Sequence, residues 1–154
     1  MINIRKGTET DITSALNLVK ELAVYEKAPD EVEVTPAEML AWGFGSDKIF
    51  DFYVAIEDHV IVGLALYYFK YSTWKGKCLF LEDIIVTEAQ RGKGVGKLLF
   101  NQMIVVSKET KVRRMEWQVL DWNEPAINFY KKYNATLDNE WINCKFTNAQ
   151  LDKL

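Results

Sequence analysis

Two acidic residues interrupt an apolar stretch near the middle of the chain and could do proton chemistry. Glu82 and Asp83 lie inside the run from Leu79 to Val86. Acidic side chains in such a run are unusual unless they are paired or functional. In a regular strand they would point to opposite faces, so both can line one site only if a bulge lies nearby. The structural alternative is a carboxylate satisfied by a neighbouring lysine.

A glycine-rich loop follows this run and could bind an anion. Gly92, Gly94 and Gly96 occupy alternate positions. Without Cβ atoms the backbone can approach a ligand closely, and the helix expected next offers unpaired N–H donors and a partial positive charge. Three basic side chains add cations at the same place: Arg91, Lys93 and Lys97. The alternative is a glycine turn that only starts a helix.

Two nucleotide-binding motifs do not fit this loop. The Rossmann pattern needs a glycine where the chain has Lys97. The Walker pattern needs a glycine in place of Arg91 and a serine or threonine in place of Leu98. The loop is therefore predicted to hold a phosphate group in a different kind of site.

The predicted strands and helices must position the two acids and the glycine loop. Apolar patterning predicts strands over residues 2–5, 50–57, 60–68, 77–86, 114–120 and 140–146. Helical spacing and capping boxes predict helices that begin near residues 8 and 35, a helix over 94–108 and a helix from 123 onward. The first of them should end near Tyr25, and Asp58-His59 should form a hairpin turn. This order predicts a mixed α/β sheet, not a strict βαβ alternation.

Composition limits the class of protein. The 154 residues fit a single domain over 1–154, and a net charge of −3 argues against nucleic-acid binding. Cys78 and Cys144 have no ligand-like spacing, so we expect reduced thiols and no metal. No apolar run approaches the roughly 18 residues of a membrane helix. A cytoplasmic protein with no membrane partner is therefore expected.

The glycine loop resembles that of one known superfamily. The run from Arg91 to Gly96 reads R-x-x-G-x-G, which is similar to the signature of the GNAT (GCN5-related N-acetyltransferase) proteins. A second run, Asn123-x-x-Ala126-x-x-Phe129-Tyr130, matches that superfamily's second motif in the right order.

Almost the whole chain resembles one GNAT family more closely, the spermidine/spermine N-acetyltransferases, or diamine acetyltransferases, one member of which acts on thialysine. The similar segments are Lys20–Ala23, Tyr25-Glu26, Gly43–Gly45, Val62-Gly63, Tyr67–Phe69, Leu81–Asp83, Arg91-Gly92 and Trp122–Pro125. The resemblance implies the GNAT fold, a mostly antiparallel sheet flanked by helices, and acetyl-CoA as co-substrate. It also implies a small polyamine- or diamine-like acceptor and a homodimer whose amine site draws on both subunits. One departure is Asn134, where the family usually has glycine; asparagine also tolerates the left-handed conformation that ends a helix.

Roles for individual residues follow from the same resemblance. The pantetheine arm of acetyl-CoA should contact Ile84, Ile85 and Val86. Its pyrophosphate should lie against Arg91, Gly92, Lys93, Gly94, Val95, Gly96 and Lys97. The other side of the cofactor should meet Asn123, Glu124, Pro125 and Ala126, with Tyr130 as proton donor to the leaving thiolate. The amine site should be lined by Tyr25, Glu26, Glu82, Asp83, Glu116, Trp117 and Gln118.

Acetyl transfer to an amine requires a base. An alkylammonium has a pKa of about 10, so a protein group must accept its proton before the nitrogen attacks. The single histidine, His59, falls in the predicted hairpin turn, so the usual base is absent. Glu82 is predicted to act through water or to bind the ammonium. For Tyr130, the alternative to an acid role is a core aromatic with a paired hydroxyl.

Other functions stay open at this point. The acceptor could be an amino acid such as thialysine or lysine, or a protein or peptide. The chain could instead be a non-catalytic acyl-CoA-binding module, although Glu82 and Tyr130 are residues that such a module would not need.

Overall fold

The computed structural model describes residues 1–154 and contains two compact units, Met1–Gln118 and Val119–Leu154. The first unit is built on a five-stranded sheet in the order β1-β2-β3-β4-β5. Its strands are β1 (Asn3–Lys6), β2 (Asp51–Glu57), β3 (Val60–Ser72), β4 (Gly76–Val86) and β5 (Arg114–Trp117). All neighbouring strands are antiparallel except β4 and β5. The predicted mixed, mostly antiparallel sheet is confirmed, and the prediction of one domain over 1–154 stays a prediction.

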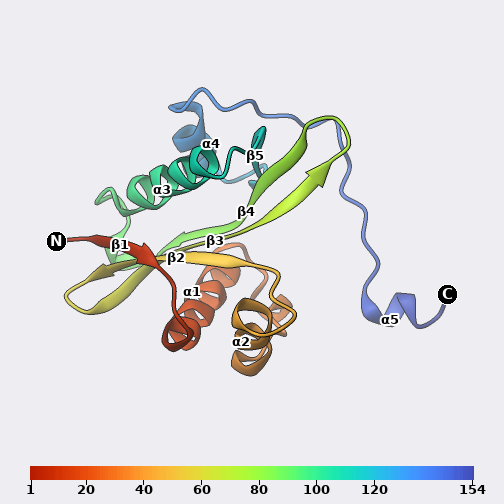
Figure 1. Ribbon diagram of the computed structural model, residues 1–154, viewed down its shortest axis with the longest axis horizontal. Coiled ribbons are helices and arrows are strands. Elements are labelled where there is room, and N and C mark those ends of the chain that lie inside the picture. The colour runs from red at the N-terminus through yellow and green to blue at the C-terminus, as the bar shows by residue number, and fades with distance from the viewer. The chain divides into compact units, whose positions relative to one another are not determined.

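Helices cover both faces of this sheet (Figure 1). They are α1 (Ile12–Tyr25), α2 (Pro36–Phe44) and α3 (Val95–Glu109), with short 3-10 turns η1 (Glu9–Asp11), η2 (Pro29–Glu31) and η3 (Glu88–Gln90). The capping boxes predicted at Thr8 and Thr35 are both present. On neighbouring positions of β3, Leu64 packs into the core with α1, whereas Gly63 lies against Leu99 of α3. The alternation of the strand therefore places α1 and α3 on opposite faces.

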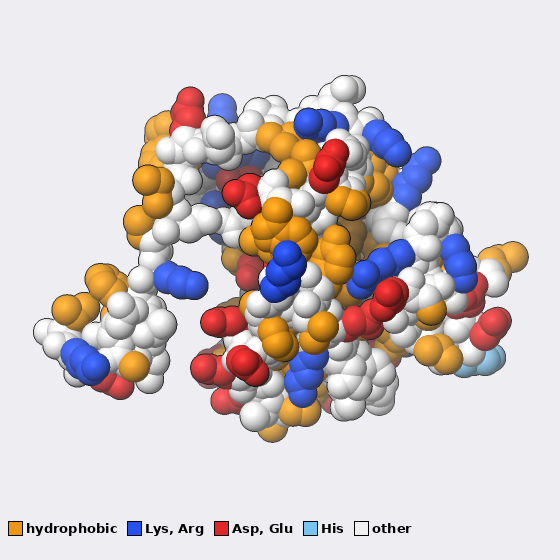
Figure 2. Space-filling view, turned by 180° about the vertical axis from the view of Figure 1, so that it is seen from behind, with side chains coloured by type: hydrophobic (Ala, Val, Ile, Leu, Met, Phe, Trp, Pro, Cys, Tyr) orange, Lys and Arg blue, Asp and Glu red, His pale blue; other side chains and the backbone are white.

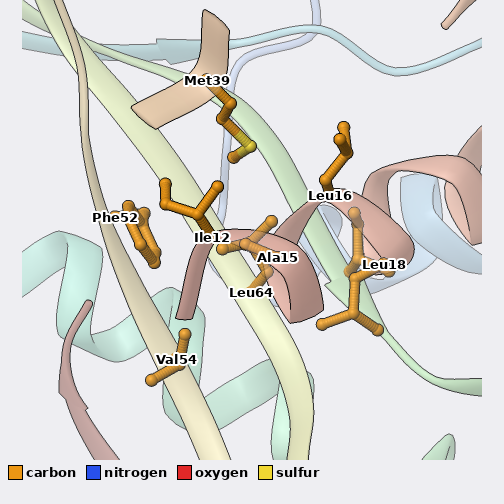
Figure 3. Close-up of a cluster of buried hydrophobic side chains, with 9 residues drawn as sticks. Ile12, Ala15, Leu16, Leu18, Met39, Phe52, Val54 and Leu64 are labelled. Atoms are coloured by element: carbon orange, nitrogen blue, oxygen red, sulfur yellow. The ribbon is translucent and has the colours of Figure 1, made fainter. Parts of the chain in front are cut away.

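The core between α1, α2 and the sheet is apolar and closely packed. Ala15, Val54 and Leu64 have no exposed surface, and Figure 3 shows them beside Met39 and Phe52. Each fully buried side chain of valine or leucine size stabilises the fold by about 1.5–3 kcal/mol. This core fixes α1 against the middle strands and so sets the position of its last residue, Tyr25.

The hairpin predicted at Asp58-His59 is confirmed. Both residues have positive φ, 48° and 66°, and Glu57 pairs with Val60. Two left-handed residues in a two-residue loop match the twist of antiparallel strands. His59 is therefore a turn residue, as its position in the sequence predicts.

A bulge interrupts β4 at Glu82. Leu66 of β3 pairs with Asp83, and Tyr67 pairs with Leu81, so Glu82 has no opposite residue on β3. The extra residue changes the alternation of side chains along β4. This is the bulge that the sequence requires if both acids are to line one site.

The second unit contains α4 (Glu124–Lys131) and α5 (Asn148–Leu151). Asn134 follows α4 with a φ of 56°, so asparagine does take the left-handed conformation expected for the family's glycine. The strand predicted over 140–146 is wrong, because the chain there forms neither helix nor strand. A strand needs a neighbouring strand for its backbone hydrogen bonds, and the second unit contains none. β5 also ends earlier than predicted, at Trp117, and β3 continues further, to Ser72.

Candidate active site

The bulge places Glu82 where it can meet a ligand. Its side chain is exposed, and its Oε2 accepts a hydrogen bond of 3.1 Å from the hydroxyl of Tyr68 on β3. Burial, followed by the negative charge of Glu82, raises the pKa of Tyr68 to about 12, so this hydroxyl remains a donor at neutral pH. The partner of Glu82 is thus a neutral phenol, not the lysine that the structural alternative requires.

Asp83 lies where both burial and neighbouring acids disfavour a negative charge. Burial, followed by the negative charges of Glu82 and Glu26, raises its pKa to about 6. Glu26 is the C-cap residue of α1, and burial raises its pKa as well. We call Glu26, Glu82 and Asp83 the acid cluster. The charged form of Asp83 is thus disfavoured by burial and by two acidic neighbours, a disadvantage that a nearby cation would offset.

The acid cluster continues outward into an acidic surface. Exposed carboxylates follow Glu26 in the chain, at Asp30, Glu31, Glu33 and Glu38. Figure 2 shows acidic side chains exposed in the part of the molecule around α2. Such a surface attracts cationic ligands over distances of a Debye length.

Two residues predicted for the amine site make other contacts. Glu116 on β5 forms ion pairs with Lys70, at 3.3 Å, and with Arg114, at 3.4 Å. The ring of Trp117 packs edge-on against Phe100 of α3, with 5.2 Å between centroids. The Trp117 contact joins the sheet to α3, and the ion pairs within the sheet partly neutralise Glu116. Glu26 and Glu82, in contrast, lie within electrostatic reach of Asp83. Gln118 follows β5 as the last residue of the first unit.

The segment 91–97, which we call the anion loop, has the backbone that an anion site needs. Gly92 and Gly94 have φ of 76° and 86°, and a Cβ atom on either would meet nothing within 4 Å. The first hydrogen bond of α3 runs from Leu98 N to Gly94 O, 3.2 Å. The amides of Val95, Gly96 and Lys97 therefore have no acceptor within the helix. Open space above the glycines and free amides at a helix start fit a phosphate group.

One edge of β4 is open next to this loop. β5 pairs with β4 only from Cys78 to Leu81. On the other edge, Ile84, Ile85 and Val86 pair with β3. From Glu82 onward, the side of β4 toward β5 thus carries no strand. A pantetheine arm could contact this edge of β4 as an added strand would.

Helix α1 holds the segment that joins β4 to the anion loop. Glu21 accepts hydrogen bonds from the Thr87 hydroxyl, at 3.0 and 3.2 Å, and from the Glu88 backbone N–H, at 2.8 Å. The Arg91 Nε donates to the Val86 carbonyl at 2.9 Å, and its guanidinium lies 4.9 Å from the ring centroid of Tyr25. On the opposite side, the Gln90 amide donates to Glu57 of β2. Tyr25, predicted for the amine site, therefore also contacts the first residue of the anion loop.

The predicted site residues of the second unit lie at α4. Asn123 is its N-cap and accepts from the Ala126 N–H at 3.4 Å, with Glu124 and Pro125 in the first turn. Tyr130 is buried, and its ring packs against Phe129 with 5.4 Å between centroids. Burial raises the pKa of Tyr130 to about 12. The phenol is therefore protonated at neutral pH, as a proton donor must be.

Comparison with known proteins identifies the family. Residues 15–135 match the model of the acetyltransferase (GNAT) family. This chain belongs to the GNAT acetyltransferases. It is 36% identical over 142 residues to the thialysine N-epsilon-acetyltransferase of Bos taurus, covering 87% of this chain and 84% of the relative. It is 34% identical over 158 residues to the human spermidine/spermine N(1)-acetyltransferase-like protein 1, covering 96% of this chain and 23% of that longer protein.

Solved structures show the same fold as this GNAT acetyltransferase. An integron cassette protein from the mobile metagenome of V. cholerae superposes with a TM-score of 0.81 at 21% identity, covering 99% of this chain and 96% of that one. An aminoglycoside acetyltransferase from an uncultured soil sample, in complex with sisomicin, has a TM-score of 0.77 at 16% identity, with 95% of each chain covered. The fold expected from the resemblance is confirmed, and the chain is an enzyme of the acetyltransferase class.

Sequence reasoning did not single out Tyr68 or Glu21 for the site. Tyr68 lies across the sheet from Glu82, a relation that appears only once the register is known. Glu21 lies in the segment Lys20–Ala23, which resembles the family, but the resemblance assigns it no role. Its spacing of four residues from Tyr25, on one face of α1, was the available signal.

None of the helices combines the length and hydrophobicity that crossing a membrane requires. No group of three or more histidine, cysteine, aspartate or glutamate side chains is arranged to hold a metal ion.

Proposed function

We propose that this GNAT acetyltransferase moves an acetyl group from acetyl-CoA directly to a primary amine of a small polyamine- or diamine-like substrate. The observation that carries the proposal is the acid cluster, in which burial and the charges of Glu82 and Glu26 raise the pKa of Asp83. A ligand with one or more ammonium groups relieves the repulsion among them. An α-amino acid also brings a carboxylate, which this cluster repels.

Acetyl-CoA would be held by the anion loop and the open edge of β4. The amides of residues 92–97 would face the pyrophosphate, and Arg91, Lys93 and Lys97 would add positive charge. Ile84, Ile85 and Val86 would line the pantetheine arm, and the resemblance to the family also assigns Asn123–Ala126 to the cofactor. When bound, acetyl-CoA supplies the activated acetyl group.

Proton movements are assigned to two residues of this chain. Glu82 accepts the proton of the ammonium, directly or through water, while the Tyr68 hydroxyl keeps its carboxylate in place. Asp83 and Glu26 hold the charge of the substrate. Tyr130 donates its phenolic proton to the leaving thiolate, and the raised pKa that burial gives it keeps the phenol protonated until that step.

A substrate panel tests the proposal. Purified protein is assayed with acetyl-CoA and putrescine, spermidine, spermine, lysine or thialysine, and free thiol release is followed at several pH values. Turnover of the diamines and polyamines with a kcat/KM at least about tenfold above that of the amino acids is the expected result. Turnover of the amino acids alone overturns the polyamine assignment.

The second candidate acceptor is an amino acid such as thialysine. It is favoured by the names of several relatives, including the thialysine N-epsilon-acetyltransferases of Bos taurus and Mus musculus. In that case a cation must bind the substrate carboxylate, and the same panel identifies the acceptor.

We further propose a cytoplasmic homodimer whose amine site draws on both subunits. The apolar side chains of Trp141, Ile142 and Phe146 support it, because they are 75%, 88% and 64% exposed in the single chain. Large apolar side chains gathered in one exposed segment are typical of a surface that a partner covers.

A further inference from the structure

Glu21 stands out because it is a carboxylate placed next to a site for an anion. Its side chain is one-third exposed, and its Oε1 lies 3.7 Å from the Arg91 guanidinium. By charge alone, a carboxylate here weakens the binding of a phosphate group. If Glu21 favours binding, it must do so through the structure that it holds in place.

The structure that Glu21 holds is the start of η3. Its two oxygens accept three contacts from two donors, the Thr87 hydroxyl and the Glu88 backbone N–H. Thr87 directly follows β4, and its own backbone N–H donates to the Val62 carbonyl of β3 at 2.9 Å. The carboxylate therefore joins α1 to the point where the chain leaves the sheet. Hydrogen bonds to a charged group are about twice as strong as neutral ones.

Arg91 is fixed by the same connection. Its Nε donates back to Val86, on the other side of η3, and its guanidinium lies over Tyr25, one turn after Glu21 on α1. Without Glu21, η3 loses its bonds to α1, and Arg91 loses its ionic neighbour. Both changes loosen the first residues of the anion loop, whose glycines cannot hold a conformation by themselves.

From this geometry we infer that Glu21 is a positioning residue for acetyl-CoA binding, which acts by fixing η3 and, through it, Arg91 and the anion loop. The inference rests on the proposed function of the loop. It assigns α1 a role in the cofactor site as well as in the acid cluster that its C-terminus carries.

Glu21 can affect acetyl-CoA binding in two ways of opposite sign: its charge weakens binding, whereas its positioning of the loop strengthens binding. Replacing Glu21 therefore distinguishes the two effects. Acetyl-CoA affinity is measured by calorimetry for wild type, Glu21→Ala, Glu21→Gln and Thr87→Val, with steady-state kinetics alongside. If Glu21 positions the loop, Glu21→Ala raises Kd and KM for acetyl-CoA by roughly tenfold, the loss of one charge-assisted hydrogen bond. The kcat at saturating acetyl-CoA changes by no more than about twofold. Glu21→Gln keeps one acceptor oxygen and recovers part of the affinity.

Thr87→Val removes one donor while it leaves every charge in place, so it should weaken binding in the same direction. Glu109→Gln, at the far end of α3 and about 20 Å from the loop by helix length, is the matched control for lost charge. Should Glu21→Ala fail to fold, as thermal melting would show, Thr87→Val decides alone. Unchanged or tighter binding in these variants overturns the inference. Wild type that does not bind acetyl-CoA at all overturns the proposed function instead.

Discussion

Asp83 is a partly buried acid whose neighbours Glu82 and Glu26 are also acids, and all three influences disfavour its charged form. Its folded-state pKa of about 6 lies above the value near about 3.9 of an unfolded chain. The folded state therefore binds its proton more tightly than the unfolded state does. Its contribution to stability is fully present below the unfolded pKa and is lost as pH rises through about 6.

Asp83→Asn is accordingly expected to stabilise the protein at pH 7.5 by an amount on the order of 1–3 kcal/mol. The gain should disappear near pH 4, where the native carboxyl is already neutral. Urea denaturation of both proteins at the two pH values checks the sign. A loss of stability at pH 7.5 would show that the aspartate is satisfied by a partner.

Substrate binding should depend on the same titration. Below about pH 6 the acid cluster loses the charge of Asp83, so KM for a diamine is expected to rise as pH falls from 7 to 5. In Asp83→Asn that KM should be higher at pH 7 and nearly independent of pH over this range. An equal pH dependence in both proteins would assign the titration to another group.

Glu82→Gln keeps the shape of the side chain and removes the base. We expect kcat to fall by about 10²–10⁴, with little change in acetyl-CoA affinity. Tyr68→Phe, which removes only the hydrogen bond to Glu82, should have a smaller effect. Steady-state kinetics with calorimetry checks this, and a kcat that stays within twofold of wild type excludes Glu82 as base.

Tyr130→Phe removes only the phenolic proton of the proposed acid. Turnover should fall by about 10²-fold or more, while acetyl-CoA binding, measured by calorimetry, survives. Tyr133→Phe, two residues beyond the end of α4, is the matched control. Unchanged turnover in Tyr130→Phe would remove it as the acid.

At the scale of elements, the turn between β2 and β3 shows how a local conformation limits stability. The β2–β3 hairpin depends on two residues in the left-handed region, and His59 has a φ of 66°. Side chains other than glycine pay about 1 kcal/mol or more for this conformation. Histidine is therefore less favourable than glycine at position 59 of this turn.

His59→Gly is expected to raise the free energy of unfolding by about 0.5–1 kcal/mol, since Asp-Gly is favoured in such a turn. His59→Ala, which also removes the imidazole but keeps Cβ, should give no gain. Chemical denaturation compares the three proteins. A loss of activity in both variants would contradict the assignment of His59 as a turn residue outside the site.

At the scale of the whole molecule, the exposed apolar side chains of Trp141, Ile142 and Phe146 are the basis of the proposed homodimer. Sedimentation of the wild-type protein should give a mass twice that of one chain. Ile142→Lys combined with Phe146→Lys should shift it toward the monomer and lower turnover. Leu154→Lys is the control, because Leu154 is also 88% exposed but lies at the chain end. A monomeric wild type contradicts the proposal.

Sequence by itself determined the features that are local along the chain. The anion loop needs only glycines next to a helix start, the capping boxes need residues three apart, and the left-handed Asn134 follows from one helix end. Glu82 and Asp83 were noticed because acids break an apolar run. Each of these depends on contacts within a few residues.

Only the tertiary structure decided how distant residues act together. The register of β3 against β4 placed Glu82 in a bulge opposite Tyr68, and the packing of α1 brought Glu26 within electrostatic reach of Asp83 and Glu21 onto Thr87. The apolar pattern at 140–146 predicted a strand, but a strand exists only where another strand pairs with it. Pairing, burial and the repulsion of charges depend on distances in space, and for residues far apart in the chain only the fold sets those distances.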